Sequence, residues 1–217
     1  LQQNADNISA LYSYFARRGI PFWFAITPDK ISMYDDELPP GYTDSSNDNI
    51  EIFLQRLREN GTPYIDLREG LHTIDPDLYR FFYKTDHHWT TLGAYYAYAD
   101  YMQSIGREPQ NLDSFEFVEV EDFLGTHYSK SKNFNVEADT LSYIKNDCQI
   151  DIMGTADSIY DYSKFETRDK YAAFLRGNNA YSTIKGNGEG KILVIKDSYA
   201  NCFVPFLAED FEQIDVL

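Results

Sequence analysis

Two short segments of the chain concentrate residue types that can carry out acid–base and nucleophilic chemistry. In the first, two of the four histidines are adjacent, in the run Asp86, His87, His88, Trp89. In the second, Ser198 follows a run of apolar residues and precedes a predicted helix. A serine, a histidine and an aspartate can act as a nucleophile, a general base and the group that orients the base. Together the two segments predict such a relay.

Each segment also has a purely structural interpretation. The Asp/His run can be a helix-entry loop, with Thr90 or Thr91 as N-cap and the histidines as surface polar residues. Ser198 can likewise be only an N-cap. A metal site is not expected, because the side chains of adjacent histidines diverge in an extended loop. Cys148 and Cys202 lie in no metal-binding spacing.

The elements that must position these segments alternate along the chain. Apolar periodicity and breaker residues predict helices over residues 3–18, about 45–60 and 91–105, a short helix after Ser198, and strands over 20–26, 63–67, 191–196 and 213–217. Such alternation is typical of an α/β layered sheet with right-handed crossovers. Ser198 then lies at the carboxyl edge of the sheet, where open α/β folds bind ligands.

The third helix and the segment after it carry further expectations. The residues expected to face inward from the 91–105 helix are Leu92, Tyr95, Tyr96, Ala99 and Met102. Residues 107–190 are polar and rich in Asp, Asn, Ser and Tyr, with a short alternation at 115–120. They predict an insert of short strands and loops.

Composition excludes several classes of protein. The 217 residues include 19 basic and 35 acidic side chains, a net charge of −16, which opposes binding to nucleic acid or to an anionic lipid surface. No phosphate-binding glycine loop that opens a helix and no cofactor fingerprint is present in the sequence, so no cofactor is expected. The two cysteines, Cys148 and Cys202, allow one disulfide or none, and we expect buried free thiols.

The two segments resemble conserved blocks of the SGNH (GDSL-type) hydrolases. The Asp86–Trp89 run, followed by Gly93 and Ala97, is similar to the last block of that superfamily, and the run from Lys196 to Tyr199 looks like its nucleophile block. Their order is inverted, as in the circularly permuted alginate and cell-wall polysaccharide O-acetyltransferases. The letters Asp-His-His-Trp are the namesake motif of the DHHW proteins. The SGNH likeness covers residues 1–105 and 191–217, and the DHHW likeness extends through 125–126, 174–178 and 205–207.

The resemblance implies a fold and a domain organisation. The fold is a flavodoxin-like three-layer α/β/α sheet, circularly permuted, with a β-rich or irregular insert. Residues 1–217 then form one SGNH-like domain, with an Asp/His half at 1–106, the insert at 107–190 and the nucleophile half at 191–217. We expect the chain to be cut at both ends from a longer product, with further strands and oxyanion residues after Leu217.

The resemblance also implies roles for individual residues. The Asp-x-x-His spacing of ordinary SGNH enzymes falls on Trp89, whereas the Asp-x-His spacing of the acetyltransferases selects Asp86 and His88, with Ser198 as nucleophile. The Ser198 backbone N–H and Asn178 are candidate oxyanion donors, although Asn178 can also be a loop residue in a turn. The other candidates for oxyanion or substrate binding are His87, Trp89 and Tyr199.

The activity implied is O-acetylation of an extracellular or cell-wall polysaccharide through an acetyl-serine intermediate. A carbohydrate acetylesterase is the nearest variant, and a non-catalytic glycan-binding or surface-assembly protein on the same fold is the alternative from another class. The expected partners are a glycan substrate and a membrane protein that supplies acetyl groups, with no nucleic acid. The parent protein is expected to be exported to the cell surface or beyond, through a signal or membrane anchor upstream of Leu1.

Overall fold

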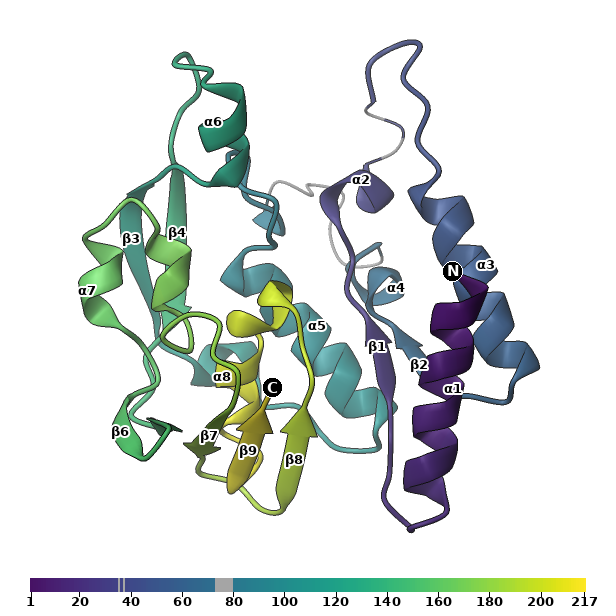
Figure 1. Ribbon diagram of the computed structural model, residues 1–217. Helices are drawn as coiled ribbons and strands as arrows, with labels where there is room; N and C mark the ends of the chain where they lie inside the picture. The colour runs from purple at the N-terminus through teal and green to yellow at the C-terminus, as the bar shows by residue number, and fades with distance from the viewer. Residues whose placement is uncertain (35, 37, 73–79) are drawn as a thin grey trace. The chain divides into compact units, whose positions relative to one another are not determined.

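The computed structural model describes residues 1–34, 36, 38–72 and 80–217, and its helices and strands confirm the predicted mixed α/β class (Figure 1). Contacts between residues group the chain into two compact units, Leu1–Ile74 and Asp75–Leu217. The single domain over residues 1–217 and the circular permutation stay predictions.

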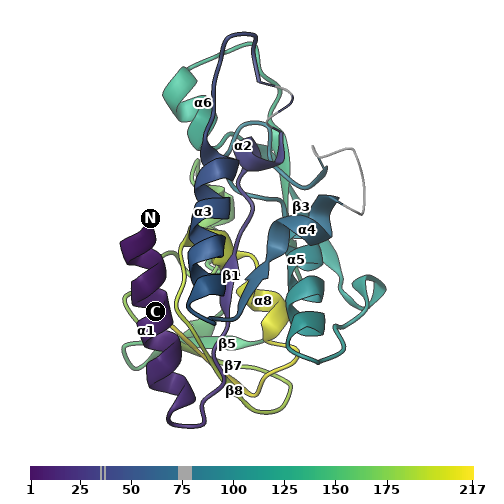
Figure 2. The same ribbon diagram turned by 90° about the vertical axis from the view of Figure 1, so that its right-hand side faces the viewer.

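The first unit is a small helix-and-strand layer. Its elements are α1 (Gln2–Ala16), β1 (Phe24–Ile26), α2 (Lys30–Met33), α3 (Ser46–Glu59), β2 (Tyr64–Asp66) and α4 (Leu67–His72). Strands β1 and β2 pair in parallel. Helices α1 and α3 lie side by side (Figure 2), and their contact buries Ala5, Leu54 and Leu57 completely or nearly so. The predicted order helix, strand, helix, strand is confirmed here, with each predicted strand shortened to three residues.

The second unit contains every element around the two predicted functional segments. Its helices are α5 (Thr91–Ser104), η3 (Leu112–Ser114), α6 (Thr126–Ser131), α7 (Tyr162–Phe165), η4 (Lys170–Ala173), η5 (Ser198–Asn201) and α8 (Val204–Leu207). Its strands are β3 (Phe117–Phe123), β4 (Asp139–Ile144), β5 (Gln149–Ile152), β6 (Thr155–Ser158), β7 (Ser182–Lys185), β8 (Lys191–Val194) and β9 (Gln213–Val216). Strands β3 and β4 form an antiparallel pair with an irregular register near the end of β3.

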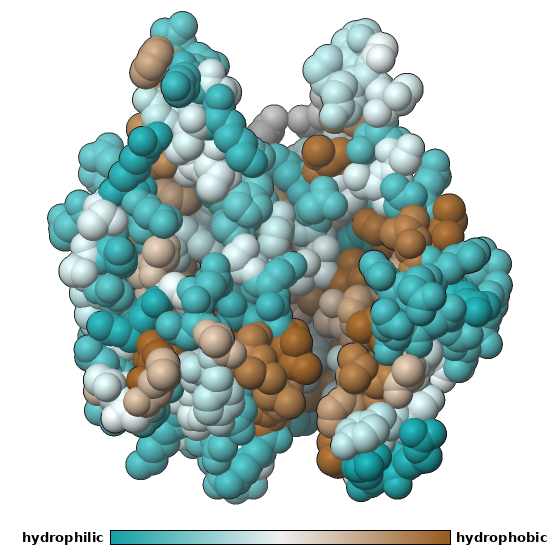
Figure 3. Space-filling model, viewed as in Figure 1, coloured by the Kyte–Doolittle hydropathy of each residue, from teal (hydrophilic) through white to brown (hydrophobic). Residues whose placement is uncertain are grey.

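A five-stranded sheet joins β8 and β9 to strands from the middle of the chain. Its order is β6-β5-β7-β9-β8, with β8 and β9 parallel and the other pairs antiparallel. The predicted insert therefore contributes three strands to the sheet that carries the nucleophile segment. Strand β8 is at the edge, and apolar surface gathers over it where Leu193 and Ile195 are 48% and 66% exposed (Figure 3).

Helix α5 follows the Asp/His run and is buried on more of its circumference than its large apolar residues predict. Thr90 is its N-cap and accepts a hydrogen bond from the Gly93 N–H at 3.1 Å. The buried residues are Thr91, Gly93, Ala94, Tyr95, Ala97, Tyr98, Tyr101 and Met102. Of the predicted inward residues, Leu92, Tyr96 and Ala99 are only half-buried. The difference arises because small residues allow close packing: a Cβ at Gly93 would lie 2.6 Å from the Phe81 carbonyl oxygen.

Cys148 and Cys202 are both buried free thiols, as predicted. Burial raises the pKa of the Cys148 thiol to about 11 and that of the Cys202 thiol to about 12. Within the part of the chain that the structure describes, no helix is both long and apolar enough to cross a membrane.

Candidate active site

The Asp/His run lies in a bent segment that neighbouring strands hold in place. The Asp139 carboxylate, at the start of β4, accepts hydrogen bonds from the Lys84 N–H at 2.8 Å and the Thr85 N–H at 2.7 Å. It also accepts the Thr85 hydroxyl at 2.6 Å. The same hydroxyl oxygen accepts the Gly125 N–H at 3.1 Å. Asp139 and Thr85 therefore fasten the segment before Asp86 to the start of β4 and to the residues just after β3.

Asp86, His88 and Ser198 form a continuous chain of hydrogen bonds. His88 Nδ1 lies 2.6 Å from Asp86 Oδ1, and His88 Nε2 lies 2.8 Å from Ser198 Oγ. Because the Asp86 carboxylate accepts, Nδ1 carries the proton and Nε2 offers its lone pair to the Ser198 hydroxyl. The structure therefore brings the three predicted residues within hydrogen-bond distance of one another, and their catalytic roles stay predictions. Asp86 and His88 are 2% and 5% exposed, so water only weakly screens the electrostatic interactions between these hydrogen-bonded groups.

The Asp86 carboxylate is buried but remains the charged partner. Burial alone would raise its pKa, yet hydrogen bonds from the His88 ring and from the backbone N–H groups of His88 and Thr126 outweigh burial. The Thr126 N–H donates to Asp86 Oδ2 at 2.7 Å, and the His88 N–H donates to Oδ1 at 3.0 Å. The pKa of Asp86 therefore lies well below its usual range. A charged Asp86 fixes the orientation of the His88 ring and stabilises its protonated form.

His87 lies beside His88, and the predicted divergence of the two rings is wrong. Their centroids are 3.8 Å apart, because residues 84–88 form bends and the side-chain alternation of an extended strand does not apply. His87 Nδ1 is 2.7 Å from Thr126 Oγ1. Burial lowers the pKa of His87, and a positive charge on His88 would lower it further. His87 does not line the pocket at Ser198. Its contact with the relay is the one between its ring and the His88 ring.

Ser198 begins η5, four residues after Val194, the last residue of β8. The Asp197 carboxylate caps this turn by accepting the Tyr199 N–H at 2.9 Å. The Ser198 side chain opens into a pocket of about 590 Å³. Asp86 and His88 line the same pocket, together with Gly125 and Thr126 at the start of α6, Tyr171 in η4, and Asn178. The hydroxyl, its hydrogen-bonded histidine and the cavity therefore meet at one place in the second unit.

The profile of the DHHW protein family matches residues 25–217, which include the whole arrangement just described. The chain belongs to the DHHW family. No curated protein sequence matches this DHHW protein.

Solved structures share its fold. A DHHW family protein from Eubacterium siraeum is 24% identical, with a TM-score of 0.79, over 98% of this chain and 75% of the other. Bacillus cereus PatB1 with a sulfonyl adduct is 22% identical, with a TM-score of 0.82, over 99% and 78%. The O-acetyltransferase domain of Pseudomonas putida AlgJ is 15% identical, with a TM-score of 0.59, over 97% and 68%. These likenesses confirm the SGNH-like α/β fold expected for this DHHW protein.

Asn178, predicted as an oxyanion donor, lines the pocket with Ser198. Its Oδ1 accepts hydrogen bonds from Asn201 Nδ2 at 3.1 Å and Lys196 Nζ at 3.2 Å. These two bonds fix which side of the amide is the acceptor, so the Nδ2 group is directed away from Asn201 and Lys196. Burial lowers the pKa of Lys196.

Trp89 and Tyr199 connect the Asp/His segment with η5 and do not line the pocket at Ser198. Trp89 is fully buried, and its Nε1–H donates to the Tyr199 carbonyl at 2.9 Å. The Tyr199 hydroxyl donates to the His87 carbonyl at 2.6 Å. The structure therefore corrects the predicted substrate contact for Trp89: a fully buried ring has no surface for a ligand, and its hydrogen bond joins the Asp/His segment to η5.

Sequence reasoning missed two neighbours of the relay. The Tyr171 ring, in η4, stacks on the His88 imidazole, and the Tyr171 hydroxyl donates to the Ser198 carbonyl at 3.1 Å. No local motif marks it. Gly125 is the other: a Cβ at this position would lie 2.2 Å from Asp86 Oδ2, so only glycine leaves room for the carboxylate. The one feature of the sequence that pointed to Gly125 was that the likeness to DHHW proteins extends through residues 125–126.

The residues Asp86, His87 and His88 offer ligand atoms within 4.8 Å of one another. Each of these side chains already has protein hydrogen-bond partners, including Thr126 and Ser198. A cation would have to displace the bond from Asp86 to His88. The donor set therefore fits a proton relay better than a metal site.

Proposed function

We propose that this DHHW protein is a serine-dependent acyltransferase that moves acetyl groups onto the hydroxyls of a polysaccharide. The observation that carries the proposal is the pair of hydrogen bonds through His88, 2.6 Å to Asp86 and 2.8 Å to Ser198. A general base within this range of a hydroxyl is the arrangement that activates a serine nucleophile.

In the first half-reaction, Ser198 Oγ attacks the carbonyl carbon of an acetyl donor while its proton passes to His88 Nε2. The tetrahedral intermediate collapses, the bond to the leaving group breaks, and His88 returns the proton to that group. Ser198 then carries the acetyl ester, and Asp86 stabilises the imidazolium that forms in between. The Ser198 backbone N–H and the Asn178 amide are the proposed donors to the oxyanion.

In the second half-reaction a sugar hydroxyl takes the place of the leaving group. His88 removes its proton, the hydroxyl oxygen attacks the acetyl carbonyl, and the bond to Ser198 Oγ breaks. His88 returns the proton to Ser198 Oγ, which restores the free hydroxyl. If water enters instead, the same residues act as an esterase. The outcome depends on how the 590 Å³ pocket holds the acceptor and excludes water.

Two of the similar solved structures support acyl transfer. The AlgJ structure is that of an O-acetyltransferase domain. PatB1 carries a sulfonyl adduct, and sulfonyl reagents react with activated nucleophiles. The alternative, a non-catalytic glycan-binding protein, gives no reason for a buried, charged Asp86 aligned through His88 with a hydroxyl.

We further propose that the protein acts on a glycan outside the cytoplasmic membrane, after export, and receives acetyl groups from a membrane partner. The proposed substrate, an extracellular or cell-wall polysaccharide, supports this location. Fractionation of cells that produce the full-length gene product tests it; finding all of the protein in the cytosol would contradict it.

The activity is tested by incubating the protein with a chromogenic acetyl ester, with and without an oligosaccharide acceptor. A transferase releases the chromophore faster with acceptor and forms an acetylated sugar. An esterase releases acetate at the same rate with or without it. Wild-type protein that releases no chromophore beyond the rate of Ser198→Ala contradicts both and supports the binding protein.

A further inference from the structure

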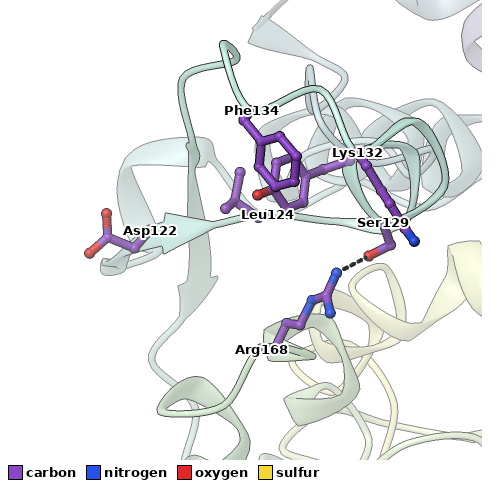
Figure 4. A pocket seen from close by; sticks show the side chains of 7 residues that line it. Asp122, Leu124, Ser129, Lys132, Phe134 and Arg168 are labelled. Atoms are coloured by element: carbon purple, nitrogen blue, oxygen red, sulfur yellow. Dashed lines mark hydrogen bonds between the residues drawn. The ribbon is translucent and has the colours of Figure 1, made fainter.

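A second pocket, of about 690 Å³, opens beside the active-site pocket in the same unit (Figure 4). We call it the outer pocket; its lining residues are Asp122, Leu124, Tyr128, Ser129, Lys132, Phe134 and Arg168. Leu124, Ser129 and Arg168 also line the pocket at Ser198. The two cavities therefore share a wall, and a chain-like ligand can extend from one into the other.

The outer pocket carries positive charge in a strongly acidic protein. Its lining has two cations, Lys132 and Arg168, and one carboxylate, Asp122. Helix α6, which adjoins the pocket, contains one lysine and no acidic residue, although the whole chain has a net charge of −16. Arg168 is held at the shared wall, where one N–H donates to Ser129 Oγ at 3.0 Å (Figure 4). Its fork of five donors leaves it able to bind a planar anion.

The same pocket presents an aromatic ring to solvent. Phe134 is 80% exposed and meets Tyr128 edge to face, with centroids 6.4 Å apart. Lys132 has a left-handed φ of 51° at the end of α6. That conformation ends the helix and turns the chain, so that Lys132 and Phe134 both reach the pocket. The surface over α6 is otherwise mostly hydrophilic (Figure 3), which suits a sugar better than an apolar partner.

We propose that the outer pocket binds the acceptor, and that the acceptor is an acidic polysaccharide whose sugars carry carboxylates. This inference rests on the proposed function of the Ser198 site and names its substrate class. A carboxylate binds Lys132 and Arg168, and its sugar ring stacks on Phe134. The next sugar along the chain lies over the shared wall, with a hydroxyl directed to Ser198.

Calorimetric titration of the wild-type protein tests the proposal without any turnover. The probes are a tetramer of galacturonic acid, which is anionic, and a tetramer of N-acetylglucosamine, which is neutral. We expect the anionic tetramer to bind at least about 10-fold more tightly near 0.15 M salt, and to lose most of that advantage at about 1 M salt. Equal binding of the two tetramers, or absence of binding by both, would overturn the acidic acceptor.

Matched variants locate the site. Lys132→Gln and Phe134→Ala should each weaken binding of the galacturonic acid tetramer at least about 5-fold. Phe134→Tyr, which keeps the ring, and Lys185→Gln, which removes an exposed lysine of β7, should not. If Lys185→Gln weakens binding as much as Lys132→Gln, the effect is one of overall charge and the outer pocket is not the site.

Release of chromophore from an acetyl ester by wild-type protein separates the two proposals. Turnover without tetramer binding overturns the outer pocket alone. Tetramer binding without turnover supports the outer pocket as a glycan site and removes the catalytic role of Ser198.

Discussion

The phenol ring of Tyr171 lies parallel to the His88 imidazole, with centroids 3.8 Å apart and ring planes inclined by 8°. The Tyr171 hydroxyl also donates to the Ser198 carbonyl at 3.1 Å. One buried side chain thus contacts both the proposed base and the backbone of the proposed nucleophile. We infer that Tyr171 positions the two groups, since it restricts the tilt of the imidazole and the path of η5.

Replacing Tyr171 with Phe keeps the stack on His88 and removes the bond to the Ser198 carbonyl. The free energy of unfolding should fall by about 1–3 kcal/mol, because a half-buried carbonyl loses its partner. For a chromogenic acetyl ester, kcat should fall several-fold with little change in KM. Denaturant titration and steady-state kinetics measure the two effects. An unchanged kcat in the folded variant would show that the hydroxyl does not position Ser198.

Asp86 makes the stability of the protein depend on acid pH. Its pKa is lowered in the folded state from an ordinary value of 3.8, so it contributes stability that is fully present above about pH 4. That contribution is lost as the pH falls below the ordinary value toward the lowered one. In Asp86→Asn the decline of the unfolding free energy below pH 4 should therefore be shallower. Exposed Asp147→Asn is the control, and an equal change in both variants would refute the role of Asp86.

Gly125 is predicted to be essential for the geometry of the relay. In Gly125→Ala the new methyl group meets Asp86 Oδ2 at 2.2 Å, so the carboxylate or the loop must move. Stability should fall by about 1–3 kcal/mol and turnover at least about 100-fold.

Gly188→Ala provides the control, because its methyl group would lie 2.0 Å from backbone atoms of Asp210, away from the pocket. It should lose similar stability but keep turnover in its folded fraction. Equal loss of turnover in both variants would mean that Gly125→Ala acts only through stability.

Local sequence signals sufficed for the residues of the relay. Asp86, His88 and Ser198 could be predicted because their spacing resembles known blocks and because a strand end places Ser198 at a sheet edge. Tyr171 and Asp139 could not, since both lie far along the chain from Asp86 and His88 and reach them only through the tertiary fold. The relative direction of His87 and His88 was mispredicted because an extended backbone was assumed where the chain bends. The prediction of the buried face of α5 was incomplete, because it used the spacing of large apolar residues and left out glycine and most of the alanines.

Both cysteines are predicted to be unreactive in the folded protein. Burial raises the pKa of Cys202 to about 12 and that of Cys148 to about 11, so the thiolate that reacts is scarce near pH 8. A disulfide reagent should modify neither thiol quickly in native protein, and should modify two thiols per chain in denaturant. Rapid reaction of one native thiol, or no thiols after unfolding, would contradict this.

The most direct measurement of the central claim is mass spectrometry of the Ser198 peptide after brief reaction with an acetyl ester and an acid quench. We predict one added acetyl group on Ser198 in the wild-type protein. Ser198→Ala should carry no acetyl group in this peptide and should not release the chromophore. Steady turnover by Ser198→Ala, or an acetyl group that accumulates on a different side chain of the wild-type protein while Ser198 stays unmodified, would contradict the assignment of Ser198 as the nucleophile.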